Sequence, residues 1–151
     1  MEIKAQLNKP YTDTQRMNFI VEQNHQNGYE IRETEFALQA WGYTAEEIAQ
    51  QEAERIAKLH LTRGDVFRGL LMARQITRAQ IRALIEAMPE ETPEQAIAKE
   101  GYLIDFDEAL EFYRGVQLID TLGSQLGISS EAMTQFFETN DYHYLIPDVR
   151  N

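Results

Sequence analysis

A short run of acidic residues is the first place where side chains of this sequence could do chemistry. Asp105, Asp107, Glu108 and Glu111 fall within about two helical turns of one another. Paired carboxylates can act as general acid and base, or bind a hard cation. The simpler interpretation is a helix start, in which Asp105 is the cap, the next two acids favour the positive helix end and Glu111 faces solvent. The Asp-x-Asp-x-Asp-Gly pattern of an EF-hand is absent.

The other reactive residue types form no recognisable site. The histidines, His25, His60 and His143, are far apart and none stands in an HExxH motif, which argues against a catalytic zinc. Cysteine is absent, so disulfides, thiolate metal sites and cysteine nucleophiles are excluded. The phosphate-binding and nucleophile motifs GxxxxGK[ST], GxGxxG and GxSxG do not occur. We therefore predict a non-enzymatic protein with no catalytic residue, cofactor or metal, although an active site can be assembled without a linear motif.

One stretch satisfies the spacing of a DNA-binding helix-turn-helix. Gly123 lies four residues before Gly127, which is followed by Ile128, the potential cap Ser129 and apolar Met133. The second helix, however, has no lysine or arginine and carries two acids that would face phosphates. We therefore predict that the chain does not bind double-stranded DNA tightly.

The same stretch is the second copy of an internal repetition. Residues 66–87 can be laid over residues 118–139 at an offset of 52 positions, each copy being a helix, a turn with an isoleucine and a hydroxyl cap, and a second helix. Two such helical hairpins, bracketing 93–114, predict a bundle. The apolar residues expected in its core are Phe67, Leu70, Leu71, Ile81, Leu84, Ile85, Leu110, Phe112, Leu118, Ile119, Leu122, Leu126, Met133 and Phe136.

Local signals predict the individual elements. Residues 1–7 alternate like a half-buried strand, and 29–43 are ambiguous between strand and helix, with a short strand favoured. Capping boxes at Thr12 and Thr44 predict helices that begin there. Further caps are predicted at Thr62, Thr77, Thr92 and Ser129 or Ser130. The first helix should bury Met17, Ile20, Val21 and Asn24, and a helix from 106 to 114 should begin at Asp105.

Together these signals predict a mainly α protein. The expected architecture is a helical bundle of two helical hairpins plus connecting helices, with a small N-terminal β-containing unit. The predicted parts are a strand-helix-strand unit over 1–43, a linking helix over 44–60, the helical bundle over 61–138 and an irregular tail over 139–151.

Composition and charge limit the functions that this chain could have. A chain of 151 residues with 43% hydrophobic content can bury a core that needs no disulfide or metal ion to hold it. The net charge of −11 comprises −6 over 1–54, +6 over 55–82 and −11 over 83–151. The basic band could contact a nucleic acid or an acidic partner, or Arg68, Arg74, Arg78 and Arg82 could simply pair with neighbouring carboxylates. No apolar run suits a membrane span or signal peptide, so a soluble cytoplasmic protein that does not bind membranes is expected.

Aromatic residues are concentrated near the N-terminus. The aromatic residues of this stretch of 33 residues are more than a small unit can easily bury, and they include Tyr11, Tyr29, Phe36, Trp41 and Tyr43. Aromatic residues are enriched in interface hot spots, so we predict that these residues bind a protein partner. The alternative is that they form the core of the small unit.

Three stretches carry a resemblance to a known group of proteins. Residues 9–47, 55–70 and 103–127 resemble small proteins encoded in the tail-gene region of phages and prophages of Firmicutes-type bacteria. The resemblance implies a role in tail or tail-fibre structure or assembly, phage tail components as partners, and a location in the bacterial cytoplasm or the virion. Self-association into a homo-oligomer is a separate expectation. The rival hypothesis is an acidic regulatory phage protein that mimics or contacts nucleic acid, or a nucleic-acid-binding protein, through residues 86–111.

Overall fold

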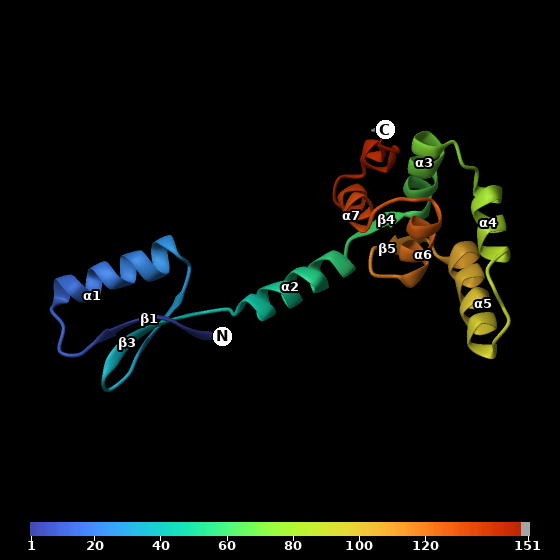
Figure 1. Ribbon diagram of the computed structural model, residues 1–151. Coiled ribbons are helices and arrows are strands. Elements are labelled where there is room, and N and C mark those ends of the chain that lie inside the picture. The colour runs from blue at the N-terminus through green and yellow to red at the C-terminus, as the bar shows by residue number, and fades with distance from the viewer. Residues whose placement is uncertain (149–151) are drawn as a thin grey trace. The chain divides into compact units, whose positions relative to one another are not determined.

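The computed structural model describes residues 1–148 and shows a mainly α protein, as the sequence predicted (Figure 1). The chain forms two compact units, residues 1–53 and 54–151. Their boundary falls inside the helix α2 (Ala45–Ala57), within the segment predicted as a linking helix. The finer division into four parts stays a prediction.

Unit 1 contains a three-stranded antiparallel sheet. Its strands are β1 (Glu2–Asn8), β2 (Glu30–Glu33) and β3 (Ala37–Gly42), in the order β1-β3-β2. The register pairs Glu2 with Gly42 and Asn8 with Ala37, and it shifts at a bulge between Ile3 and Ala5. The ambiguous segment 29–43 is therefore two strands of a hairpin.

A helical segment covers one face of this sheet (Figure 1). The capping box at Thr12 starts α1 (Asp13–Ile20), which continues as the π-helix η1 (Val21–Gln26). Beneath them, Leu38 and Ala40 are almost completely buried. The buried stripe predicted for this helix is wrong, because Met17 is 57% exposed and Val21 39% exposed. The wider π turn shifts the helix faces by about one residue, and Gln23 is buried there instead.

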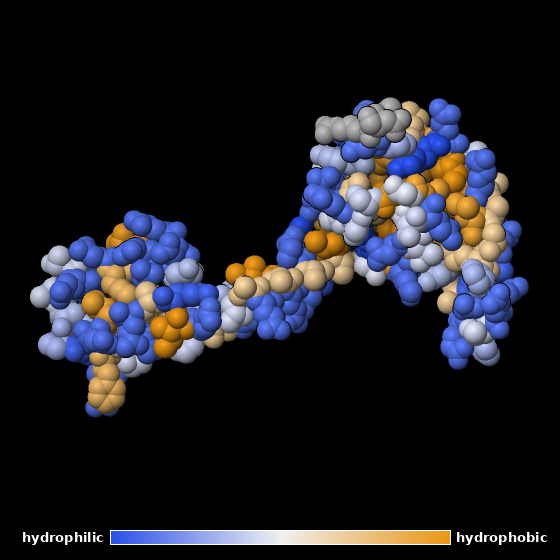
Figure 2. Space-filling model, viewed as in Figure 1, coloured by the Kyte–Doolittle hydropathy of each residue, from blue (hydrophilic) through white to orange (hydrophobic). Residues whose placement is uncertain are grey.

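The helix α2 begins at the predicted capping box. The Thr44 amide donates to the Glu47 carboxylate, and the Glu47 amide donates to the Thr44 hydroxyl. Apolar side chains follow one side of α2 (Figure 2), and Ile48 is 56% exposed. The helix ends at Ala57 because β4 (His60–Thr62) begins three residues later.

Unit 2 repeats one arrangement twice. In the first copy β4 leads into α3 (Arg63–Arg74) and α4 (Arg78–Glu86), and in the second β5 (Glu111–Tyr113) leads into α6 (Gln117–Gln125) and α7 (Ser130–Thr139). The two strands pair antiparallel, with Leu61 opposite Phe112. The turn residues Gln75 and Gly127, 52 positions apart, both adopt the left-handed conformation, at φ 53° and 68°. A final 3-10 helix, η2 (Tyr142–Leu145), follows α7.

The prediction for 106–114 is wrong. Asp105 does not cap a helix, since α5 (Pro93–Glu108) starts from a capping box at Thr92 and runs through it. The chain then enters β5, and Leu110 is 83% exposed rather than in the core. The helix prediction failed because β5 is fixed by its pairing with β4, which lies about 50 residues away in the sequence.

Most of the predicted core is buried, with defined exceptions. Leu71 is 47% exposed, and Phe67, Leu84 and Leu126 are only partly buried. The core also contains buried residues that were not predicted: Val66, Phe106, Ile128, Phe137 and Leu145. The burial of Leu145 shows that residues after Thr139 pack on unit 2 and are not wholly irregular; residues 149–151 of the predicted tail lie outside the described residues.

Candidate protein-binding surface

The sheet of unit 1 separates the five predicted aromatic residues into two groups. Tyr29, Trp41 and Tyr43 lie where β1 begins and β3 ends, and Tyr11 and Phe36 lie at the opposite end. The sequence placed all five in one binding group, so the structure brings three of them together and leaves two apart.

The first group borders a groove of about 440 Å³. Gly42 shapes it, because an added Cβ there would come within 2.8 Å of the Tyr29 ring. Gly28, at φ 73°, makes the turn that brings Tyr29 to this position, and the Asn24 amide holds the Tyr29 carbonyl at 2.7 Å. The groove is lined by Met1, Lys4, Asn27, Gly28, Tyr29, Glu30, Trp41, Gly42, Tyr43 and Ile48.

Beside the groove, the sheet face opposite α1 carries polar side chains around Trp41. The Trp41 indole donates to Gln39 at 3.1 Å, Gln39 donates to Gln6 at 3.0 Å, and Gln6 donates to Asn8 at 2.5 Å. Ile3, opposite Trp41 in the register, is 45% exposed. This row of amides keeps hydrogen-bonding groups at the surface. Such a surface is hydrated in the free protein and can form hydrogen bonds to a partner when one binds.

An arginine stacks on the tryptophan of this face. The Arg32 guanidinium lies 4.8 Å from the Trp41 ring centroid and is held there by two hydrogen bonds to Glu30. The hydrogen bond from Arg32 lowers the pKa of Glu30 below its ordinary value. No local pattern in the sequence singles out Arg32, Gln39 or Gln6. Burial alternates only over 38–42, and Arg32 and Gln6 reach this face through the strand register, which places both opposite Gln39.

The second group lies against a small charged cluster. The Tyr11 hydroxyl donates to Glu33 at 2.7 Å, and Lys9 lies 3.1 Å from the same carboxylate. These hydrogen bonds raise the pKa of Tyr11 and lower that of Glu33. Phe36, at the hairpin loop, is 73% exposed.

The basic band is largely neutralised within unit 2. Arg68 pairs with Asp65, and Arg82 pairs with Asp107 and Glu86. Arg74 donates to the carbonyl oxygens of Leu145 and Leu126, and Arg78 stacks on two phenylalanine rings. Internal pairing, rather than a free cationic stripe, therefore accounts for most of these side chains.

In the helix-turn-helix of the second copy, the arginine near the two helices is buried. Arg114 is 4% exposed and donates to Asp120, Thr134 and Ser130. A buried arginine holds the hairpin together and does not present its charge to a phosphate backbone.

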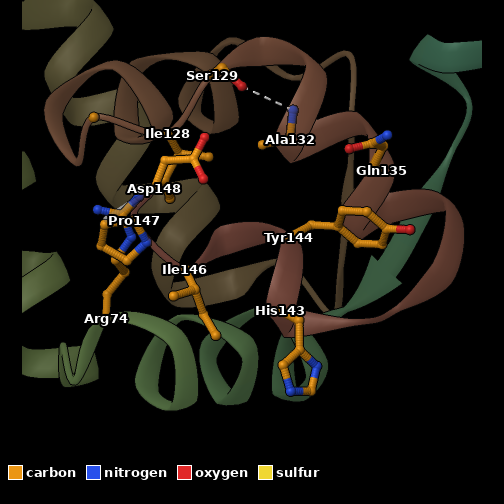
Figure 3. Close-up of a pocket in the computed structure, with 11 residues that line it drawn as sticks. Arg74, Ile128, Ser129, Ala132, Gln135, His143, Tyr144, Ile146, Pro147 and Asp148 are labelled. Carbon is orange, nitrogen blue, oxygen red and sulfur yellow. Dashed lines mark hydrogen bonds between the residues drawn. The ribbon is translucent and has the colours of Figure 1, made fainter. Parts of the chain in front are cut away.

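A depression of about 590 Å³ lies next to α7 (Figure 3). Ser129 caps α7 by accepting a hydrogen bond from the Ala132 amide, and Arg74 approaches from α3. Both of the Arg74 hydrogen bonds go to backbone oxygens, so this arginine ties η2 to the helix-turn-helix.

The candidate acidic residues are divided between α5, which contains Asp105, Asp107 and Glu108, and β5, which contains Glu111. Asp107 is paired with Arg82. His143 contacts Asp141 in the short segment after α7. Within residues 1–148, no three histidine or acidic side chains are grouped so that they could hold a metal ion. Across the same residues, none of the helices has the length and apolar content to cross a membrane.

Comparisons with known proteins give one partial similarity. The chain matches no protein-family model and no solved structure. It is 35% identical over 66 residues to the 5-methyltetrahydropteroyltriglutamate--homocysteine methyltransferase of Salinibacter ruber. The match covers 44% of this chain and only 8% of that protein's length.

Proposed function

We propose that this is a non-enzymatic protein that binds another protein through the open sheet face and groove of unit 1, in phage tail or tail-fibre structure or assembly. The observation that carries the binding proposal is the position of Trp41. Its ring borders the groove and donates a hydrogen bond to Gln39, the first amide of the surface row. Tryptophan, tyrosine and arginine dominate interface hot spots, and all three types meet here.

The tail role comes from the resemblance of residues 9–47, 55–70 and 103–127 to phage tail-region proteins. A chain that folds as two compact units is compatible with a binding or assembly module. The predicted two-hairpin bundle belongs to the same proposal, as the rigid part that would carry unit 1. The partial similarity to a methyltransferase spans too little of either chain to bring an activity with it.

The first experiment identifies the partner. The tagged chain is used to capture proteins from prophage-induced cells, and the captured protein is then purified and titrated by calorimetry. A tail or fibre component that binds in the purified system supports the proposal. A nuclease, polymerase or repressor would instead favour the regulatory rival, and no binding between purified components would refute the proposal.

Matched variants then locate the binding surface. Ile3→Arg places a charge on the open face, and Phe36→Arg places the same charge at the opposite end of the sheet. Both side chains are exposed, so neither change should unfold unit 1, which circular dichroism can check. We expect Ile3→Arg, and also Trp41→Ala, to weaken binding by about 30-fold or more, the effect of losing a hot spot of about 2 kcal/mol. Equal losses in Ile3→Arg and Phe36→Arg would contradict this choice of surface.

A further inference from the structure

The outer edge of β1 in unit 1 carries main-chain groups that no strand pairs with among residues 1–148, because the strand order is β1-β3-β2. The Lys9 amide donates to the Phe36 carbonyl at 2.9 Å. Hydrogen-bonded pairs recur every second residue along an antiparallel ladder, so Leu7 also directs its N–H and C=O toward β3. The N–H and C=O groups of Gln6 and Asn8 therefore point away from β3, along the free edge.

The side chains along this edge are unfinished on both faces of the sheet. On the face covered by α1, Leu7 and Ala5 are only partly buried, whereas Leu38, which pairs with Leu7, is 1% exposed because β3 has a strand on either side. On the other face, Gln6 and Asn8 are exposed and end the row of amides. Among the residues that the structure describes, the Asn8 side-chain N–H groups donate to none. A further strand beside β1 would complete both faces.

The opposite edge of the sheet, along β2, is protected against strand addition. Three of the four residues of β2 are charged. At its start, the Tyr29 amide donates to the Gln23 carbonyl at 2.8 Å, and the Tyr29 carbonyl accepts from the Asn24 side chain at 2.7 Å. Charged side chains, lysine above all, and bulges discourage edge pairing, and in β1 the bulge and Lys4 protect only the first half. The uncharged residues 5–8 are therefore the open edge.

We infer that this edge of β1, residues 5–8, binds an extended segment of the protein partner as a fourth strand. Exposed main-chain donors and acceptors at two-residue intervals match the spacing of another chain in the extended conformation. In antiparallel pairing, one residue of the segment exchanges two hydrogen bonds with Gln6, and a second, two positions away, exchanges two with Asn8. The inference rests on the proposed protein-binding function of unit 1 and specifies the part of the partner that it recognises.

The two faces of the edge also define the side chains of this segment. Residues directly opposite each other in an antiparallel pair project from the same face. The residues opposite Gln6 and Asn8 would therefore lie beside the row of amides, where polar side chains such as threonine can form hydrogen bonds. The residues between them would lie beside Ala5 and Leu7, where apolar side chains such as valine extend the core. The segment is thus uncharged and alternates between polar and apolar residues.

Amide hydrogen exchange of the full-length chain, followed by NMR, tests the main-chain pairing. In the free protein we expect the Leu7 amide to be protected and the Gln6 and Asn8 amides to exchange rapidly. The probe is a blocked peptide of alternating threonine and valine with a lysine at each end. At saturation it should slow exchange at Gln6 and Asn8 by about tenfold or more. Methylating its threonine nitrogens should abolish this effect, whereas methylating its valine nitrogens, which face away from β1, should not.

Matched variants test the same edge with the partner captured from cells. Gln6→Pro removes an outward N–H and no hydrogen bond to β3, and proline is tolerated on edge strands where the N–H faces solvent. Gln6→Ala removes the same side chain but keeps the N–H. We expect Gln6→Pro to bind the partner about tenfold more weakly than Gln6→Ala. Circular dichroism checks the folding of both variants, and the exchange measurements decide the question if the proline variant unfolds.

Several results would overturn this inference. These are exchange at Gln6 and Asn8 that the peptide does not slow, equal slowing by the peptide with methylated threonines, or equal partner affinity of the two Gln6 variants. Protection that grows with the concentration of the free protein would assign the edge to a second copy of this chain instead. If Trp41→Ala abolishes partner binding and Gln6→Pro does not, the proposed function stands and only the strand pairing is wrong. If purified partners never bind, the proposed function fails, and the peptide experiment still decides the edge.

Discussion

Replacing Arg114 by alanine tests how unit 2 is held together. The residue is 4% exposed, and its guanidinium makes four hydrogen bonds: to Asp120 at 2.6 Å, to Thr134 at 3.1 Å and to the hydroxyl and carbonyl of Ser130 at 2.8 and 3.2 Å. Breaking a buried ion pair costs about 3–5 kcal/mol, but the Asp120 side chain is 59% exposed and recovers water. We therefore expect a loss of about 2–3 kcal/mol, and at most about 1 kcal/mol for Asp120→Asn.

The assay uses the distribution of chromophores. Trp41, the single tryptophan, lies in unit 1, whereas most of the helices lie in unit 2. During urea unfolding of Arg114→Ala, the ellipticity transition should move to lower urea while the tryptophan fluorescence transition stays in place. A free energy within about 0.5 kcal/mol of wild type would refute the role given to Arg114. Equal movement of both transitions would show instead that the two units unfold together.

Three further predictions follow from individual contacts. Gly69→Ala should destabilise unit 2 by about 1–3 kcal/mol, because the new methyl overlaps the Phe136 ring, and a wild-type ellipticity transition would contradict this. Tyr11→Phe should lower the stability of unit 1 most at neutral pH. The raised pKa of Tyr11 stabilises the fold below its ordinary value of 10.0, and this contribution disappears as pH rises through the folded-state pKa. The difference between variant and wild type in the free energy of unfolding, followed by tryptophan fluorescence, should therefore shrink as the pH rises above the folded-state pKa of Tyr11. A difference that stays constant with pH would exclude the Tyr11–Glu33 hydrogen bond as its cause. Finally, random duplex DNA should not bind below micromolar concentration in an anisotropy titration, whereas tight, steeply salt-dependent binding would implicate Arg78.

Helix starts were predictable because their signals are local. Thr12, Thr77 and Thr92 each accept a hydrogen bond from the amide three residues on, and the glutamine at that position reaches back. Ser129 caps α7 in the predicted way. A cap needs only four consecutive residues, so tertiary packing rarely overrides it.

Strand pairing and the binding surface could not be predicted from short stretches of sequence, because both depend on residues that are far apart in the chain. The segment 111–113 is a strand because it pairs with 60–62, and on its own it read as part of a helix. The five aromatic residues are close in sequence, but the β2–β3 hairpin sends Phe36 and Trp41 to opposite ends of the sheet. The amide row beside Trp41 depends on the register between β1 and β3, which the alternating pattern of either strand alone does not fix.

Each of the two copies in unit 2 has an arginine just after its strand, and different side chains surround the two arginines. Arg63 and Arg114 each lie two residues after the paired Leu61 and Phe112. In the second copy, Arg114 is bound by Ser130 and Thr134 at the start of α7. These hydroxyls satisfy the arginine within its own hairpin.

In the first copy, the positions equivalent to Ser130 and Thr134 are Arg78 and Arg82, which cannot accept hydrogen bonds from another arginine. The connecting helix α5 supplies the replacements. Arg63 donates to the Asp107 carbonyl, and Arg82 pairs with the Asp107 carboxylate. Arg63 and Arg78 both stack on the Phe106 ring, at 5.8 and 5.7 Å. The second hairpin is therefore satisfied internally, whereas the first depends on α5, which buries Phe106 in the core of unit 2.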